Sequence, residues 1–223
     1  MGFWVDKIIN EKPKPVLPPN QDVPKKFEGV AVVLARGQGI EKYNPEEWTH
    51  ATKYGVNAIQ MIHEIEHLVT IDDHLSLSLL NAEREFLTED VKDRIRFTIK
   101  NGDKAKYWHH PDTEIARKMK CHVPLKLGSF KQVGVFNRDY VPSHKNTTFT
   151  AAALAARHGH KEIVLFGEHL YGHYYFDNGD RIKVMRSGYA MLKATLNYYG
   201  IDLYISHKES ALYGILDIHP KLA

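Results

Sequence analysis

The 223-residue sequence has a single cysteine, Cys121, a small net charge and no long apolar run. One cysteine cannot form a disulfide within the chain, so we expect an intracellular, cytoplasmic protein. Every apolar run falls far short of the roughly 20 residues that a membrane-spanning helix needs, so no membrane span is expected. The net charge of +3 is too small to indicate nucleic-acid binding by itself, although a pI near 8.7 is compatible with anionic ligands such as nucleotides.

The amino-terminal segment differs in composition from the rest of the chain. Residues 10–26 contain five prolines and several lysines, and such a segment buries little apolar surface. We therefore predict that residues 1–27 form an extended, proline-rich arm that the core fold does not need. Residues 28–223 are predicted to form one folded domain, because no internal repeat or second low-complexity segment divides them.

Apolar runs alternate with helical patterns along this domain. Strands are expected at residues 29–35, 68–71, 132–136, 163–166 and, as the final strand, 201–206. Helices are expected at residues 45–54, 151–156 and 187–199. Residues 75–80 and 89–99 are expected to be short helical or connecting segments, and residues 107–140 mostly loop. This alternation predicts an α/β fold, a Rossmann-like and mostly parallel sheet with helices on both faces.

Ligands of open α/β sheets bind beyond the carboxyl ends of the strands, so residues that follow predicted strands are candidate site residues. The turn Arg36-Gly37-Gln38-Gly39 follows the first strand, and its glycines would let a phosphate approach backbone N–H groups. The turn lacks the third glycine of the dinucleotide-binding fingerprint and the Lys-Ser/Thr of a P-loop. A tight turn without a ligand remains an equal alternative.

Polar and aromatic residues also follow the strand predicted at 163–166. Gly167 ends this strand, and behind it lie Glu168, His169, Tyr171, His173, Tyr174 and Tyr175. Upstream, Asn146 and Thr147 open the helix that contains residues 151–156, where such side chains cap the helix and are also able to bind phosphate.

Two further patterns suggest metal ions. Asp72 and Asp73 end the strand predicted at 68–71, where carboxylates either hold a metal or a ribose hydroxyl, or are simply solvated. Residues 63–67, His-Glu-Ile-Glu-His, match the HExxH pattern of zinc hydrolases, which requires a helix. The strand that follows favours a different local fold, so His63 and His67 are not expected to share a zinc ion.

Taken together, these segments resemble the small bacterial sialyltransferases of glycosyltransferase family 42 and the related Rossmann-type group that includes archaeal 6-hydroxymethylpterin diphosphokinases. The resemblance covers roughly residues 28–75 and 143–222. Its motifs are the glycine turn, Asn57 after the first predicted helix, Thr147-Thr148, the segment Gly-His-Lys-Glu-Ile-Val-Leu-Phe-Gly at 159–167, Gly-Ile-Asp-Leu-Tyr at 200–204 and Glu-Ser-Ala-Leu at 209–212.

The resemblance implies a nucleotide-sugar-dependent glycosyltransferase that needs no cofactor. The implied nucleotide-binding residues are Arg36, Gly37, Gln38, Gly39, Asn57, Asn146, Thr147, Gly167 and Glu168. The family's histidine near the penultimate helix is missing here, because residues 185–188 read Met-Arg-Ser-Gly. His169 or His173 would then act as the base, with Tyr171 and Arg36 donating to the phosphate.

Other functions remain open at this point. One is a Mg²⁺-dependent pyrophosphokinase-type transferase that uses Asp72 and Asp73. The others are a non-catalytic nucleotide binder and, remotely, the zinc hydrolase. The expected partners are a nucleotide or nucleotide-sugar and an acceptor that the sequence does not identify, and the sequence leaves homo-oligomerisation open.

Overall fold

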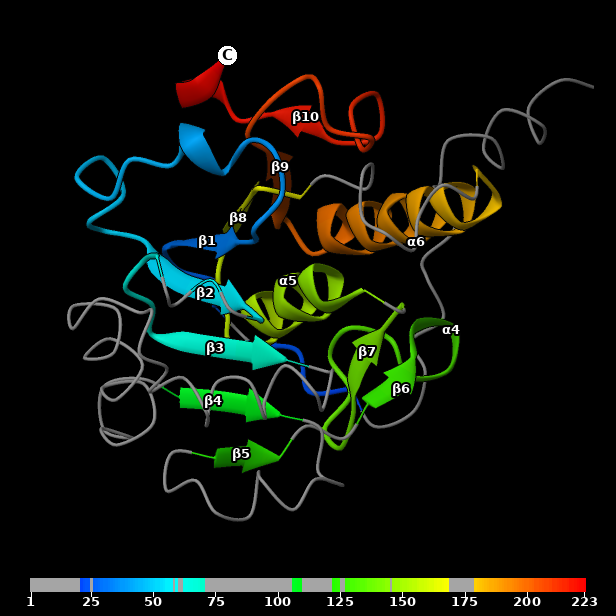
Figure 1. Cartoon of the computed structure of the whole chain (residues 1–223). Coiled ribbons are helices and arrows are strands. Elements are labelled where there is room, and N and C mark those ends of the chain that lie inside the picture. Colours follow the sequence, from blue (N-terminus) through cyan, green and yellow to red (C-terminus); the bar gives the residue numbers. More distant parts are fainter. Residues whose placement is uncertain are drawn as a thin grey trace, which may run out of the picture.

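The computed structural model describes residues 21–24, 26–57, 59, 62–70, 106–109, 122–124, 127–144, 146–168 and 179–223. Its centre is an eight-stranded sheet in the order β10-β9-β8-β1-β2-β3-β4-β5 (Figure 1). Every neighbouring pair in this sheet is parallel, which confirms the predicted α/β class with a parallel sheet. The strands are β1 (Val30–Leu34), β2 (Thr52–Val56), β3 (His67–Thr70), β4 (Lys106–His109), β5 (His122–Pro124), β8 (Glu162–Phe166), β9 (Asp202–Ile205) and β10 (Asp217–Ile218).

The order of the strands changes direction once, next to β1. From β1 the chain adds β2, β3, β4 and β5 on one side, and it then returns to place β8, β9 and β10 on the other side. Residues of β1 and β8 are buried almost throughout, as expected for central parallel strands that are covered on both faces. The topological switch point therefore lies between the carboxyl ends of β1 and β8.

Among the described elements, the helices α5 (Thr147–Arg157) and α6 (Gly179–Tyr198) cover one face of the sheet. Helix α5 begins at Asn146, whose side chain accepts a hydrogen bond from Phe149 N at 2.7 Å. Its alanines at 151–153, 155 and 156 are fully buried, so the helix lies close against the strands. Helix α6 packs in the same apolar cluster. The helices predicted at 151–156 and 187–199 are confirmed, and both begin earlier than expected.

The opposite face is covered by the connection between β1 and β2 and by the last residues of the chain. This connection contains a short 3-10 helix, η1 (Ile40–Lys42), and a second one, η3 (Pro220–Leu222), lies near the carboxyl end. Tyr43 and Trp48 pack their rings against Phe166 of β8, at centroid distances of 5.3 and 5.5 Å. In the described part of the chain, helical segments therefore lie on both faces, with α5 and α6 on one and the 3-10 turns η1 and η3 on the other.

The helix predicted at residues 45–54 is wrong. Asn44 does accept a hydrogen bond from Glu46 N at 3.2 Å, but only successive turns follow, and residues 52–56 form β2. Strand β2 pairs with β1 on one side and β3 on the other, so pairing in the sheet outweighs the helix-opening pattern that precedes it.

Other segments also depart from expectation. The strand predicted at 132–136 is wrong, because residues 130–133 form the short helix α4 (Phe130–Val133). The supposed loop region contains β4, β5 and β6 (Leu127–Ser129), and β6 pairs with β7 (Val141–Ser143) in a separate two-stranded sheet. A further strand, β10, follows the one predicted to be last. The segments 75–80 and 89–99 lie outside the described residues.

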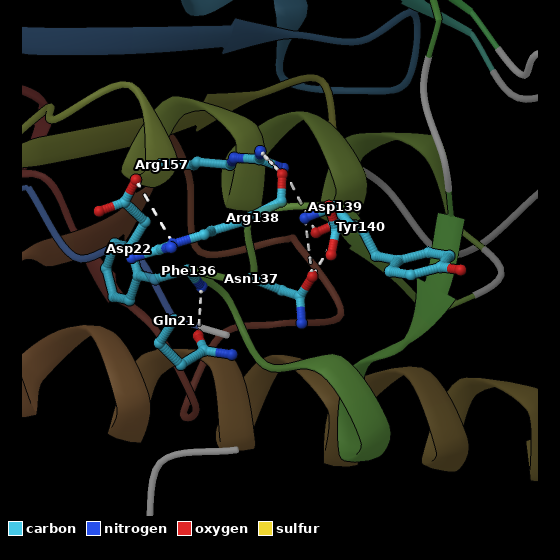
Figure 2. A network of polar contacts seen from close by, with 8 residues as sticks. All are labelled: Gln21, Asp22, Phe136, Asn137, Arg138, Asp139, Tyr140 and Arg157. Atoms are coloured by element: carbon cyan, nitrogen blue, oxygen red, sulfur yellow. Dashed lines mark hydrogen bonds and ion pairs between the residues drawn. The ribbon is translucent and has the colours of Figure 1, made fainter. Parts of the chain in front are cut away.

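The described part of the predicted arm is attached to the domain (Figure 2). The Gln21 amide donates from Nε2 to Val133 O at 2.7 Å and accepts at Oε1 from Phe136 N at 2.9 Å. Asp22 N donates to Phe136 O at 2.6 Å, and Val23 packs against the main apolar cluster. The boundary at residue 27 stays a prediction, but these contacts place residues 21–23 with the folded domain.

Candidate functional site

The glycine turn after β1 and the residues after β8 meet at the switch point. Ala35 N donates to Phe166 O and Gly37 N donates to Gly167 O, both at 2.9 Å. Gly167 has a φ of +68°, and a Cβ there would lie 2.2 Å from Ala35 O. Only glycine fits this close approach of two backbones. Topology therefore brings together two segments that are about 130 residues apart in the chain.

Glu168 is buried directly behind this contact, with 5% of its surface exposed. Asn146 Nδ2 donates to its Oε1 at 3.0 Å, and Thr148 and Tyr189 also hydrogen-bond to its carboxyl group. Burial raises the pKa of Glu168, and these hydrogen bonds oppose the rise. Ser210 Oγ donates to Glu168 O at 3.0 Å and fixes its backbone. The site thus holds a carboxyl group whose neutral form is favoured.

The amino terminus of α5 faces the same carboxyl group through its cap. Asn146 Oδ1 accepts from Phe149 N and from the Tyr189 hydroxyl at 3.2 Å, while its Nδ2 donates to Glu168. Burial and the nearby Glu168 raise the pKa of Tyr189 well above its ordinary value. Thr147 is buried in the first turn. The positive end of the helix dipole therefore lies at the carboxyl edge of the sheet, where it favours an anion.

Two N–H groups of the glycine turn already have partners within the protein. Gly37 N donates to Gly167 O, and Gly39 N donates to Glu41 Oε2 at 2.9 Å. The expected approach of a phosphate to these two N–H groups is therefore not available in this arrangement. Arg36 and Gln38 are exposed, so their side chains remain accessible to a ligand at this edge.

Asn57 lies on the other side of the glycine turn. Gly55 of β2 pairs with Leu34 of β1, so residues two positions beyond this pair, Asn57 and Arg36, leave the sheet at the same edge. Asn57 has a φ of 55°, its N donates to Val69 O at 3.0 Å, and its Oδ1 accepts from Thr70 Oγ1 at 3.3 Å. These contacts fix the asparagine at the carboxyl ends of β2 and β3.

His207 joins the site, and the sequence interpretation missed it. It follows β9, and its Nδ1 lies 2.9 Å from Ser206 Oγ. Its ring lies directly on the glycine turn, since a Cβ on Gly39 would be 2.1 Å from His207 Cε1. The signal was the same as for Glu168: a polar residue just beyond a predicted buried strand. We call Gly37, Gly39, Asn146, Gly167, Glu168 and His207 the switch-point cluster.

The remaining predicted site residues are not described. His169, Tyr171, His173, Asp72 and Asp73 lie outside the described residues, so the catalytic and metal-binding assignments stay predictions. Among the residues that the structure does describe, no group of three histidine, cysteine or acidic side chains is placed to hold a metal ion. The helices in this part of the chain are also too short or too polar to cross a membrane.

The HExxH segment does not have the geometry of a zinc hydrolase. Residues 62–66 contain a turn and bends but no helix, and β3 begins at His67, so the strand predicted from residue 68 is confirmed over its described part. His67 stacks on Tyr54 with ring centroids 4.5 Å apart, whereas His63 packs edge-on against Tyr43 at 5.1 Å. The two histidines thus pack on different tyrosines, and the helix that the motif requires is missing.

No protein-family model and no curated protein sequence matches the chain. Solved structures of sialyltransferases from Campylobacter jejuni are similar in fold. CstII, solved with the substrate analogue cytidine-5'-monophosphate, is 14% identical with a TM-score of 0.47, covering 88% of this chain and 87% of its own. The alpha-2,3-sialyltransferase in apo form is 13% identical with a TM-score of 0.43, covering 92% and 85%. At these values the likeness assigns no activity.

Proposed function

We propose that the chain binds a nucleotide or nucleotide-sugar at the switch-point cluster and acts as a glycosyltransferase-like protein. The observation that carries the proposal is the hydrogen bond from Gly37 N to Gly167 O, which joins the glycine turn to the buried Glu168 at the topological switch point. Crevices at such points are where open α/β sheets bind their ligands.

The chemistry around the cluster suits an anionic ligand. The amino terminus of α5 contributes a positive dipole end, and the exposed Arg36 supplies a guanidinium for a phosphate at the same edge. Transfer of a glycosyl group needs a base for the acceptor hydroxyl and donors for the phosphate of the leaving group. His169 or His173 and Tyr171, which follow Glu168 in the chain, are the side chains proposed for these roles.

Binding is tested by thermal unfolding with the 5'-monophosphates of cytidine, uridine, adenosine and guanosine and with their nucleosides. A ligand at about 100 times its dissociation constant should stabilise the folded protein by about 2.7 kcal/mol. Arg36→Ala should reduce the shift caused by a nucleotide and leave that caused by its nucleoside. Arg138→Ala, another exposed arginine, is the matched control. Absence of any nucleotide-dependent shift contradicts the proposal.

The reaction is tested separately on the full chain. Release of the nucleoside monophosphate from a nucleotide-sugar should be abolished by His169→Ala or His173→Ala, with nucleotide affinity unchanged. Release that both variants retain would exclude these two histidines as the base. Mg²⁺-dependent release of a nucleoside monophosphate from a nucleoside triphosphate, with none from the nucleotide-sugar, would instead favour the pyrophosphokinase-type alternative and direct attention to Asp72 and Asp73.

A further inference from the structure

The buried carboxyl group of Glu168 is a feature of the switch point whose charge state the proposed function leaves open. Its side chain hydrogen-bonds to Asn146, Thr148 and Tyr189, and Ser210 holds its backbone. A buried carboxylate is normally paired with a cation. Among the described residues, however, no lysine, arginine or histidine forms an ion pair with Glu168, and its hydrogen-bond partners are an amide and two hydroxyl groups.

The cations on the neighbouring elements bond elsewhere or face solvent. On α6, Arg186 lies three residues before Tyr189 and donates to a backbone carbonyl, and Lys193 lies four residues after it and pairs with an aspartate of β10 at 2.8 Å. Arg36 of the glycine turn and Lys208 after β9 are exposed. A negative charge on Glu168 would therefore lack a counter-charge in the interior, which favours the neutral form.

The number of available hydrogens indicates the same charge state. Phe149 N–H donates to Asn146 Oδ1, so this atom is the amide oxygen, and Nδ2 is the donor that Glu168 Oε1 accepts. The Tyr189 hydroxyl directs its single hydrogen to Asn146 Oδ1 at 3.2 Å. It also hydrogen-bonds to Glu168 and has no second hydrogen to donate, so the carboxyl group must be the donor in that contact. Only a protonated Glu168 satisfies all of these contacts.

Loss of this proton would disturb the start of α5. An ionised Glu168 would accept the hydrogen of Tyr189, and the phenol oxygen would then face Asn146 Oδ1 with no hydrogen between the two atoms. Asn146 Oδ1 is the atom that caps the helix. The new negative charge would also lie beside the positive end of the helix dipole, where the phosphate is proposed to bind. The proton of Glu168 is therefore linked to the anion site through both geometry and charge.

We propose that Glu168 is a positioning residue that acts in its protonated form, donating to Tyr189 and so holding Asn146 and the amino terminus of α5 in the arrangement that receives the phosphate of the ligand. This assignment rests on the proposed function and deepens it, because it specifies the charge state in which the site binds an anion. A neutral carboxyl group supports the helix cap without competing with the phosphate for the helix dipole.

The charge state is measured by infrared spectroscopy on the full chain. At about pH 7.5 exposed carboxyl groups are ionised, because their ordinary pKa values are about 4. A protonated carboxyl group has a C=O stretching band that a carboxylate lacks. The spectrum of the wild-type protein minus that of Glu168→Gln should therefore contain this band, and its absence would overturn the assignment.

The positioning role is measured by isothermal titration calorimetry with cytidine monophosphate and cytidine. Glu168→Gln retains a donor for Tyr189 and an acceptor for Asn146, so it should bind the monophosphate within about two-fold of wild type. Glu168→Ala removes both groups and should weaken monophosphate binding about ten-fold, with a much smaller effect on cytidine. If the nucleotide panel selects another base, that nucleotide and its nucleoside replace the cytidine pair.

A second variant tests the link to the helix cap and keeps the test valid if Glu168→Ala does not fold. Tyr189→Phe removes the hydroxyl group between Glu168 and Asn146 and should weaken monophosphate binding about three-fold. Tyr43→Phe is the matched control, because Tyr43 is also buried but its hydroxyl has no hydrogen-bond partner among the described residues. This control should bind both ligands as the wild-type protein does.

Three results of the binding experiment overturn the assignment. If Glu168→Gln loses as much monophosphate affinity as Glu168→Ala, the site requires a carboxylate. If Glu168→Ala and Tyr189→Phe lose none, or lose equal affinity for cytidine, these residues support only the fold. If the wild-type protein binds no nucleotide of the panel, the proposed function fails and the positioning role with it, whereas the first two results, with nucleotide binding by the wild type intact, refute the role of Glu168 alone.

Discussion

Gln21 is predicted to contribute measurably to stability, although it belongs to a segment whose composition suggests a dispensable arm. Its amide donates to Val133 O at 2.7 Å. It also accepts from Phe136 N at 2.9 Å, the bond that Figure 2 draws. Phe136 is fully buried, so water does not readily replace the partner that Gln21→Ala removes. Leaving the buried Phe136 N–H without a partner costs about 1–3 kcal/mol. Losing the bond to Val133 O costs less, because Val133 is only half-buried and water is able to replace the Gln21 amide there.

The expected total is therefore about 2–3 kcal/mol of unfolding free energy. For a chain of this size, that corresponds to a fall of about 5–10 °C in Tm. Urea and thermal unfolding, followed by circular dichroism, would measure both quantities. A chain that starts at Gln21 retains every contact described for the arm, whereas one that starts at Phe27 loses them all and should be less stable than Gln21→Ala.

Asp22→Ala is the matched control. The Asp22 carboxylate lies 3.9 Å from Arg138 Nε, but both side chains are largely exposed, and such pairs contribute little. The backbone hydrogen bond from Asp22 N to Phe136 O is unaffected by this substitution. We expect a change below about 0.5 kcal/mol. The reasoning is refuted if Gln21→Ala is no more destabilising than Asp22→Ala.

Three further predictions concern the interior. Gly167→Ala should destabilise the protein several times as much as Gly200→Ala. Both glycines have positive φ, which should cost about 1–2 kcal/mol at Gly200, but only at Gly167 would the new Cβ also meet backbone atoms. Unfolding curves of the two variants that coincide would contradict this. Glu168→Gln should retain stability at pH 7.5, whereas Glu168→Ala should lose about 2–3 kcal/mol. Because burial raises the pKa of Glu168 in the folded state, the stabilisation from its neutral carboxyl group should be lost as pH rises through that folded-state pKa. Unfolding free energy measured as a function of pH would show this loss in the wild-type protein and not in Glu168→Gln. Burial lowers the pKa of His160 below its ordinary value of 6.5, so the unfolding free energy of the wild-type protein should fall as pH drops below 6.5. In His160→Gln, the unfolding free energy measured with urea should fall less between pH 7 and pH 5.

The sequence predicted the central part of the fold because local signals there agree with the tertiary structure. Uninterrupted apolar runs mark β1 and β8, and a capping asparagine followed by alanines marks α5. In contrast, β2 reads Thr-Lys-Tyr-Gly-Val, a weak strand pattern that is stabilised by its neighbours on both sides. The valines and phenylalanine at 133–136 suggested a strand, but their backbone is bound by Gln21, 112 residues earlier in the chain.

The candidate site was predictable only in part, for a related reason. Residues directly after strands, such as Gly167 and Glu168, were accessible to topological reasoning because parallel strands end at one edge. The contact between His207 and Gly39 joins two separate strand ends, and no periodicity indicates which side chain rests on which glycine. The use of the Gly37 and Gly39 N–H groups by Gly167 and Glu41 was likewise invisible, because it depends on how the turn folds back on its surroundings.

The packing of Trp48 has a consequence for the order of events during synthesis. Lys221 Nζ lies 4.8 Å above the Trp48 ring and donates to Glu47 O at 2.7 Å, a contact between residues 174 positions apart. His219 also packs on this tryptophan and bonds to Glu162 Oε1 at 2.8 Å. A ribosome adds roughly 5–20 residues per second, so His219 and Lys221 are synthesised many seconds after Trp48. During that interval Trp48 lacks these partners, so we expect an incomplete chain to expose more aromatic surface on this face of the sheet and to aggregate more readily than the full chain.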